Sequence, residues 1–263
     1  MKSSSLLDRH LHALEACNQR GGRMLSLIDL IAAGTLDVPL AAYLAAMMRR
    51  GASLLVGALP GGAGKTTIMC ALLNFLPDDV AIRALDGAPA MAAATGDDAI
   101  GATCYIAHEI GAGGYYAYVW DAAARAFLAL AKRGHITASN LHADTLEQTY
   151  AQLCGDLSVP RDHVCAIALK VYVAVQHEHG KRPRRRIAAV YESTGRDDVL
   201  VWRHTPDGFE RAASARLVGR REEDRMATFL SALRNTGTRT IAAVRAALMR
   251  FDETVAHAHP SRQ

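Results

Sequence analysis

The sequence predicts an α/β fold with a mostly parallel sheet covered by helices. Two observations lead to this prediction. Short apolar runs alternate along the chain with segments that carry apolar residues at helical spacing. In addition, residues 53–67 combine a buried strand, a glycine-rich turn and the first turn of a helix. Strands that alternate with helices of this length are typical of parallel sheets, because successive parallel strands need a crossover connection.

The elements follow one another in a regular order. Strands are expected at residues 53–57, 81–85, 102–107, 136–140, 164–175, 185–191 and 199–203. Helices are expected at residues 3–18 and 25–33, from Pro39 onward, and at 65–76, 121–133, 145–154, 222–234 and 240–251, with a short helix among residues 87–101. We therefore divide the chain into an N-terminal helix or tail (1–23), an α/β core (24–210) and a C-terminal helical segment (211–263).

The bulk composition is that of a soluble globular protein. Half of the 263 residues are hydrophobic and 21% are charged, and the net charge of +4 is too small to indicate a nucleic-acid partner. The five cysteines show no CxxC spacing, which favours buried, reduced thiols. No uncharged run reaches the roughly 18 residues of a membrane span, and no apolar signal core is present at the N-terminus. We expect a cytoplasmic protein, one that could dock on the inner face of a membrane.

The glycine-rich turn has the chemistry of a phosphate-binding loop. Successive backbone N–H groups in such a turn, together with the N-terminus of the following helix, can surround phosphate oxygens. In the pattern G-x-x-x-x-G-K-[ST], the lysine reaches the β- and γ-phosphates and the hydroxyl ligates Mg²⁺. Leu59 stands at the first glycine position, which is a departure from this pattern. The candidate nucleotide-binding residues are Gly61, Gly62, Ala63, Gly64, Lys65, Thr66 and Thr67, with Thr66 on the metal.

Three polar residues follow other predicted strands. Asp86, Glu109 and His142 are expected at carboxyl ends of strands, where ligands collect in a doubly wound sheet. A carboxylate at position 109 would suit a residue that orients the attacking water beside a Mg-bound γ-phosphate, acting on the metal through water. The alternative is that Glu109 forms a surface ion pair. Spacing alone does not decide between the two.

A histidine-containing segment favours the catalytic alternative. Residues 134–145 begin with Gly134-His135, continue as a strand and contain Leu141-His142-Ala143. Together with the loop and Glu109, this order resembles the ATPases of type II and type IV secretion systems and type IV pili. Their Gly-His pair leads into a Thr-Leu-His-Ala-like His box, whose threonine is replaced here by Asn140. The resemblance implies that His135 and His142 are the His-box histidines, and that His142 contacts the γ-phosphate region.

The resemblance extends over residues 24–210. Residues 27–44 are similar to the helical segment that precedes the loop in this family, and residues 180–192 are similar to its arginine-rich strand entry. The family implies a RecA-like P-loop NTPase core that uses ATP with Mg²⁺. It also implies a ring of identical subunits, a hexamer, and a membrane-embedded platform as partners. No direct nucleic-acid contact is expected from the small net charge.

The sequence also departs from the family at positions that carry charge. Only Asp86 remains of the acidic Asp box, and Thr103 stands where an aspartate precedes the catalytic strand end. His108 replaces a glycine, and residues 110–114 lack the arginines expected after the glutamate. We expect residues 1–23 to be too short for the family's separate N-terminal domain. Because phosphoryl transfer depends on positioned charge, slow hydrolysis or binding without turnover is expected.

Several alternatives remain open from the sequence. One is a nucleotide-binding regulatory or assembly subunit with little turnover. A small-molecule kinase would share the loop but leaves residues 134–143 unexplained. The basic run 181–186 could contact nucleic acid, although it has no interleaved aromatic residues. His177 and His179 could share a face as metal ligands, but only two ligands are evident there.

Overall fold

The sheet is parallel through its first five strands and antiparallel beyond them. The computed structural model describes residues 5–18, 21–177 and 183–258. The strands lie in the order β2-β3-β5-β1-β6-β7-β8-β9, with β4 paired to β3. The predicted α/β class with a mostly parallel, helix-covered sheet is confirmed, and the arrangement is consistent with a RecA-like fold. The strands are β1 (Leu54–Gly57), β2 (Ala81–Ala84), β3 (Thr103–Ile110), β4 (Tyr118–Val119), β5 (Ile136–Leu141), β6 (Leu169–Gln176), β7 (Arg184–Ser193), β8 (Asp198–Thr205) and β9 (Gly208–Arg211).

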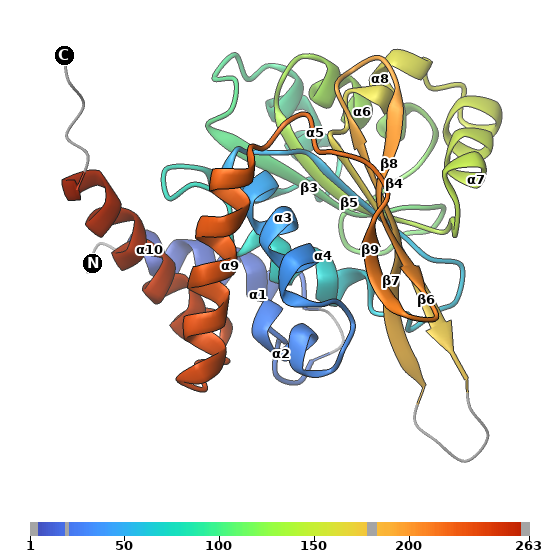
Figure 1. Ribbon diagram of the computed structural model, residues 1–263. Helices are drawn as coiled ribbons and strands as arrows, with labels where there is room; N and C mark the ends of the chain where they lie inside the picture. Colours follow the sequence, from blue (N-terminus) through green and yellow to red (C-terminus); the bar gives the residue numbers. More distant parts are fainter. Residues whose placement is uncertain (1–4, 19–20, 178–182, 259–263) are drawn as a thin grey trace.

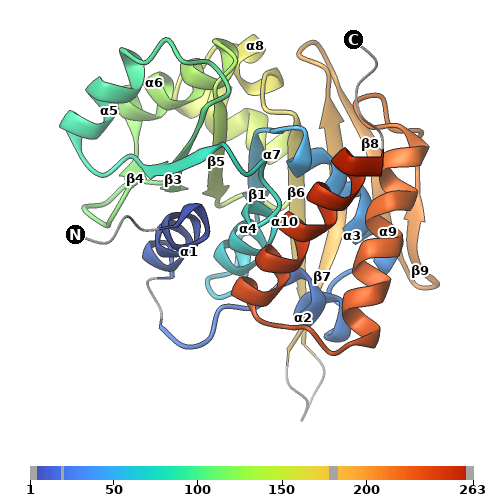
Figure 2. The same cartoon turned by 90° about the vertical axis from the view of Figure 1, so that its left-hand side faces the viewer.

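Helices cover both faces of this sheet (Figures 1 and 2). Alternate residues of β1 separate the two layers: Leu54 and Val56 belong to a core shared with α1–α4, α9 and α10, whereas Leu55 belongs to a core shared with α6 and α8. The helices are α1 (Leu6–Ala16), α2 (Leu27–Ala32), α3 (Val38–Arg49), α4 (Lys65–Leu73), α5 (Ala88–Thr95), α6 (Asp121–Lys132), α7 (Leu146–Tyr150), the π-helical turn η1 (Ala151–Asp156), α8 (Arg161–Cys165), α9 (Arg220–Asn235) and α10 (Ile241–Ala258).

The N- and C-terminal segments contribute to the same core as the sheet. Leu14 of α1 and Leu248 of α10 are fully buried in the cluster that contains β1 and α4. The buried Arg245 donates to the carbonyl oxygen of Asn74 at 2.9 Å, just after α4 ends. A cation at this position suits the last carbonyls of a helix. The C-terminal helix therefore stabilises the far end of α4, the helix that begins at the glycine-rich turn.

The main correction concerns the strand expected over residues 164–175. Residues 161–165 form the single turn α8, and β6 begins only at Leu169. A continuous apolar run does not distinguish a buried strand from a buried helical turn, and Pro160 here precedes the helical residues. The short strands β4 and β9 were not expected. The helix expected at 145–154 is split into α7 and the π-helical turn η1.

The described part of the chain offers no helix that combines the length and the apolar character needed to cross a membrane.

Candidate functional site

The loop between β1 and α4 lies at the carboxyl edge of the parallel strands. Gly57 ends β1, and a Cβ there would approach the carbonyl oxygen of Ala143 to 2.5 Å, so only glycine fits. Gly64 precedes α4 with a φ of +93°, a conformation that glycine adopts without strain. Leu59 is absent from the described residues with positive φ, which explains why this position does not require the glycine of the usual pattern.

Lys65 and His142 both contact the carboxylate of Glu109. The Nζ atom of Lys65 lies 3.6 Å from Glu109 Oε2, and Nε2 of His142 lies 2.8 Å from Oε1. Lys65 also donates to the carbonyl oxygen of Ala58 at 3.1 Å. Lys65 and Glu109 are buried, with relative exposures of 7% and 8%. The structure therefore brings the three residues predicted to be catalytic into one connected group.

The group is fixed to the loop through Leu59. Nδ1 of His142 lies 3.0 Å from the carbonyl oxygen of Leu59, and the Leu59 N–H donates to Asp144 Oδ1 at 2.6 Å. A carbonyl oxygen can only accept, so Nδ1 of His142 donates. The imidazole ring of His142 therefore lies between the loop backbone and the Glu109 carboxylate.

A β-bulge turns Glu109 toward the loop. Ala107 pairs with Ser139 and Ile110 pairs with Leu141, so three steps along β3 match two steps along β5. An extra residue of this kind bends the strand and redirects its side chains, and such bulges are frequent beside active sites. The short strand β4 supports the bulge, because the N–H of His108 donates to the carbonyl oxygen of Ala117 at 2.8 Å.

Asn140 connects the end of β3 to the start of α4. Its Nδ2 donates to the Thr66 hydroxyl oxygen at 3.2 Å and to the carbonyl oxygen of His108 at 2.7 Å. The side chain is fully buried, and its Oδ1 atom has no hydrogen-bond partner within the described residues. The Thr66 hydroxyl can ligate a cation, and the Asn140 Oδ1 atom can accept a hydrogen bond from a water on that cation. These residues therefore fit Mg²⁺ with its water ligands.

The two weaker candidates lie outside this group. Asp86 accepts a hydrogen bond from the Ala117 N–H at 3.3 Å. His135 precedes β5 and His142 follows it, so the six extended residues of β5 hold their Cα atoms roughly 20 Å apart. His135 is buried with Nε2 3.0 Å from the carbonyl oxygen of Asp97. The two histidines thus lie at opposite ends of β5.

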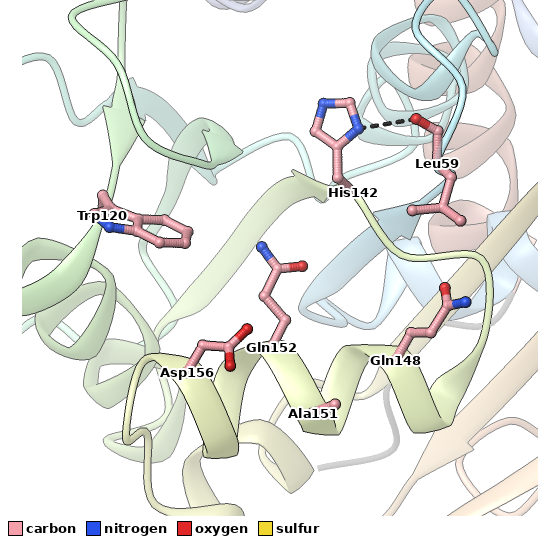
Figure 3. Close-up of a pocket in the computed structure, with 7 residues that line it drawn as sticks. All are labelled: Leu59, Trp120, His142, Gln148, Ala151, Gln152 and Asp156. Atoms are coloured by element: carbon pink, nitrogen blue, oxygen red, sulfur yellow. Dashed lines mark hydrogen bonds between the residues drawn. The ribbon is translucent and has the colours of Figure 1, made fainter.

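A pocket with a volume of about 320 Å³ opens beside His142 (Figure 3). Leu59 and His142 form one side, and the Trp120 ring lies opposite them (Figure 3). Gln152 and Asp156 rise from η1 below (Figure 3). The pocket is therefore continuous with the loop at the residue that departs from the glycine pattern.

Other candidate metal sites find no support in the described residues. Within residues 5–18, 21–177 and 183–258, no group of three or more His, Cys, Asp or Glu side chains could hold a metal ion. Of the suggested pair, His179 and the intervening Glu178 lie outside the described residues, as do residues 181 and 182 of the basic run.

Comparisons with known proteins give a distant structural similarity and no sequence match. No model of a known protein family matches the sequence, and no curated protein matches it. Among solved structures, the chain is similar to the VirB11 ATPase from the Brucella suis type IV secretion system, determined in complex with sulphate. The TM-score is 0.42 and the sequence identity is 18%; the match covers 74% of this chain. It covers 66% of the VirB11 chain, slightly less than two thirds of its length.

The sequence alone does not identify three residues of the site. Asn140 stands out there only as the replacement of a threonine, Asp144 belongs to no recognisable pattern, and Arg185 is one of several basic residues in a run. Arg185 in fact donates to the loop carbonyl of Gly62. The alternation of β7 could have indicated that adjacent arginines face opposite sides, but not which of them reaches the loop.

Proposed function

We propose that this protein binds ATP with Mg²⁺ in the loop of residues 59–66 and hydrolyses the γ-phosphate slowly. One observation carries the proposal: the Glu109 carboxylate lies between Lys65 and His142 where the loop meets the carboxyl ends of the strands. A lysine that reaches the phosphates and a carboxylate that orients water are the two side chains that this chemistry needs closest to the transferred group.

The contacts of Lys65 indicate how a nucleotide would use the site. Its ammonium now rests on the carbonyl oxygen of Ala58 and near Glu109. Phosphate oxygens would provide stronger acceptors, because both partners of the hydrogen bond would be charged. Release of Lys65 would leave Glu109 held by His142 and able to accept a proton from an attacking water. Glu109 would thus be oriented by a neighbour that is itself fixed to the loop.

Thr66 and Asn140 would hold the metal ion. The Thr66 hydroxyl is the ligand, and the buried Oδ1 of Asn140 would accept from a metal-bound water. When bound, Mg²⁺ supplies positive charge that neutralises the β- and γ-phosphate oxygens. Glu109 would act on the metal through water.

The proposal includes a motor of the secretion or pilus type. The ordered set of loop, Glu109, Gly134-His135 and Leu141-His142-Ala143 supports it. A ring of identical subunits, a hexamer, and a membrane platform are the partners we propose, with the protein on the cytoplasmic side.

A second candidate is a nucleotide-binding regulatory or assembly subunit with little turnover. The observation that favours it is the loss of acidic groups: Thr103 stands where an aspartate is expected, and Asp86 bonds to the Ala117 N–H. With Glu109 as the main carboxylate near the metal, nucleotide could bind without fast hydrolysis.

Phosphate release distinguishes the candidates. We would measure it for the wild type and Glu109→Gln, with nucleotide affinity measured for both and for Lys65→Ala. Hydrolysis that is lost in Glu109→Gln while affinity persists supports the ATPase. Equal release from both proteins contradicts the role of Glu109. Tight binding that is lost in Lys65→Ala, without hydrolysis in any variant, selects the regulatory subunit. Absence of nucleotide binding by the wild type rejects both.

A further inference from the structure

The side chain of Arg185 forms hydrogen bonds with the backbone of the phosphate-binding loop. Its Nε and Nη2 atoms donate to the carbonyl oxygen of Gly62 at 3.1 and 3.0 Å. The side chain comes from the second residue of β7, a strand far from the loop in sequence. Two parallel N–H groups on one acceptor fix its direction more firmly than a single donor would.

The same side chain lies against Gly64. A Cβ at position 64 would approach Arg185 Cδ to 3.2 Å, and the φ of +93° independently disfavours any other residue. Arg185 therefore spans the loop from Gly62 to the residue that precedes α4. The missing side chain of Gly64 therefore leaves room for this arginine.

The orientation of one peptide group links this contact to phosphate binding. In a trans peptide the C=O and N–H bonds point in opposite directions. Because Arg185 holds the carbonyl oxygen of Gly62, the N–H of Ala63 is directed to the opposite side of the peptide. That N–H makes a long contact of 3.4 Å with the carbonyl oxygen of Pro60, which a phosphate oxygen could replace.

The other arginines of the strand have a different surrounding. Arg186 donates to the carbonyl oxygen of Gly34, and a Cβ at Gly34 would approach its Nη1 to 3.2 Å. Side chains alternate between the faces of a strand, so Arg184 and Arg186 share one face of β7 and Arg185 occupies the other. The arginines at the start of β7 are therefore divided between the two faces of the strand.

We propose that Arg185 is a positioning residue that holds the phosphate-binding loop in the conformation that receives a nucleotide. This inference rests on the proposed nucleotide binding at the loop. Arg185 acts through the Gly62–Ala63 peptide group, and its two N–H groups matter as well as its charge.

The first test needs no nucleotide. The carbonyl ¹³C resonance of Gly62 reports whether its oxygen accepts a hydrogen bond. We would record it by NMR for the wild type, Arg185→Ala, Arg185→Lys and Arg184→Ala. Arg184→Ala is the matched control, because it removes the same charge from the opposite face of the strand. We expect the resonance to move in Arg185→Ala and to stay in Arg184→Ala, with equal thermal unfolding midpoints. A Gly62 resonance that is the same in all variants contradicts the hydrogen bonds from Arg185 to this carbonyl oxygen.

The second test measures the affinity for Mg·ADP and Mg·ATP by calorimetry in the same proteins. We expect Arg185→Ala to bind about tenfold more weakly, the order of effect for one hydrogen bond to a charged group. Arg184→Ala should stay within about twofold of the wild type, inside ordinary context dependence for a surface change. Arg185→Lys should recover the affinity only in part, because an ammonium group lacks the fork of two N–H donors.

The outcomes separate this inference from the proposed function. Wild-type binding together with unchanged affinity in Arg185→Ala overturns the positioning role and leaves the nucleotide site intact. Full recovery in Arg185→Lys also overturns it, because charge alone would then be sufficient. Absence of nucleotide binding by the wild type overturns the proposed function and the role of Arg185 in it. In that case the ¹³C resonance still shows whether Arg185 forms hydrogen bonds with the Gly62 carbonyl oxygen.

Discussion

Oε1 of Glu109, in β3, lies 2.8 Å from Nε2 of His142, the residue that follows β5. The other ring nitrogen of His142 donates to the loop carbonyl of Leu59, so the imidazole connects the carboxylate to the loop. Glu109 is thereby held by a side chain whose own orientation depends on the loop. A change in the loop on nucleotide binding would be transmitted to Glu109 through this ring.

Replacement of His142 tests this connection. In His142→Ala the Glu109 carboxylate loses its orienting partner while Lys65 and the loop N–H groups remain. We expect phosphate release to fall by about 10²-fold, the lower end of the range for positioned proton-transfer groups. Nucleotide affinity should change by less than about threefold, because the phosphate contacts persist. Steady-state phosphate release and calorimetry give the two values. A parallel loss of affinity and rate would show instead that His142 holds the loop.

Asn140 should affect the metal more than the nucleotide. Asn140→Ala removes the donor to the Thr66 hydroxyl and the buried Oδ1 near it. We expect the Mg²⁺ concentration for half-maximal ATP binding to rise by about tenfold, comparable to the loss of other groups that orient metal ligands. The measurement is a Mg²⁺ titration at fixed ATP. Ser139→Ala, on the opposite face of β5, is the control and should leave the titration unchanged. An equal shift in both variants would indicate a general disturbance of the strand.

The buried pair of Lys170 and Asp198 should be important for stability. The Nζ–Oδ1 distance is 2.6 Å, and the two side chains are 0% and 2% exposed. Burial lowers the pKa of Lys170, and the Asp198 carboxylate opposes this effect. Lys170→Met removes the cationic partner of the buried Asp198 carboxylate and leaves it with the hydrogen bond from the Tyr150 hydroxyl. We therefore expect a loss of about 3–5 kcal/mol in the free energy of unfolding. Urea denaturation measures it. The double variant Lys170→Met/Asp198→Leu should recover most of the loss, and a double variant no better than the single one would contradict this account.

The sequence predicts the position of the loop and of the carboxyl ends of the strands, but it does not predict the contacts between them. The glycine pattern and Lys65 identify the loop because backbone N–H groups, a lysine and a hydroxyl at fixed spacing suit phosphate. The bulge at Glu109 could not be predicted, because it depends on the register between β3 and β5. The role of Asn140 was missed for the same reason: its partners Thr66 and His108 come from other elements.

The histidines show the same limit. The sequence predicts a strand between His135 and His142, and β5 lies there, but the sequence does not indicate that only His142 contacts Glu109. Residues 164–175 were read as one strand because an apolar run carries no sign of where a helical turn ends. Packing of Val164 against the α6 side of the sheet decides the conformation there.

His10 should make the stability depend on pH in the mildly acidic range. Burial, with a smaller contribution from the nearby Arg245 charge, lowers the pKa of His10 to about 3, against an ordinary value of 6.5; a hydrogen bond with Asn74 partly opposes this. Between these two values the unfolded chain binds a proton that the folded protein does not bind. The free energy of unfolding therefore decreases as the pH falls from about 6.5 toward 3, with a slope approaching about 1.4 kcal/mol per pH unit.

Urea denaturation at pH 7 and pH 5 tests this dependence. Between these values His10 alone should account for a loss of about 2 kcal/mol in the free energy of unfolding. His10→Gln should show a smaller loss than the wild type by this amount, even if it is less stable at pH 7. His12→Gln is the matched control, because His12 is exposed on the same helix, and it should follow the wild type. If His10→Gln loses as much stability on acidification as the wild type, His10 is not the group that takes up the proton on unfolding.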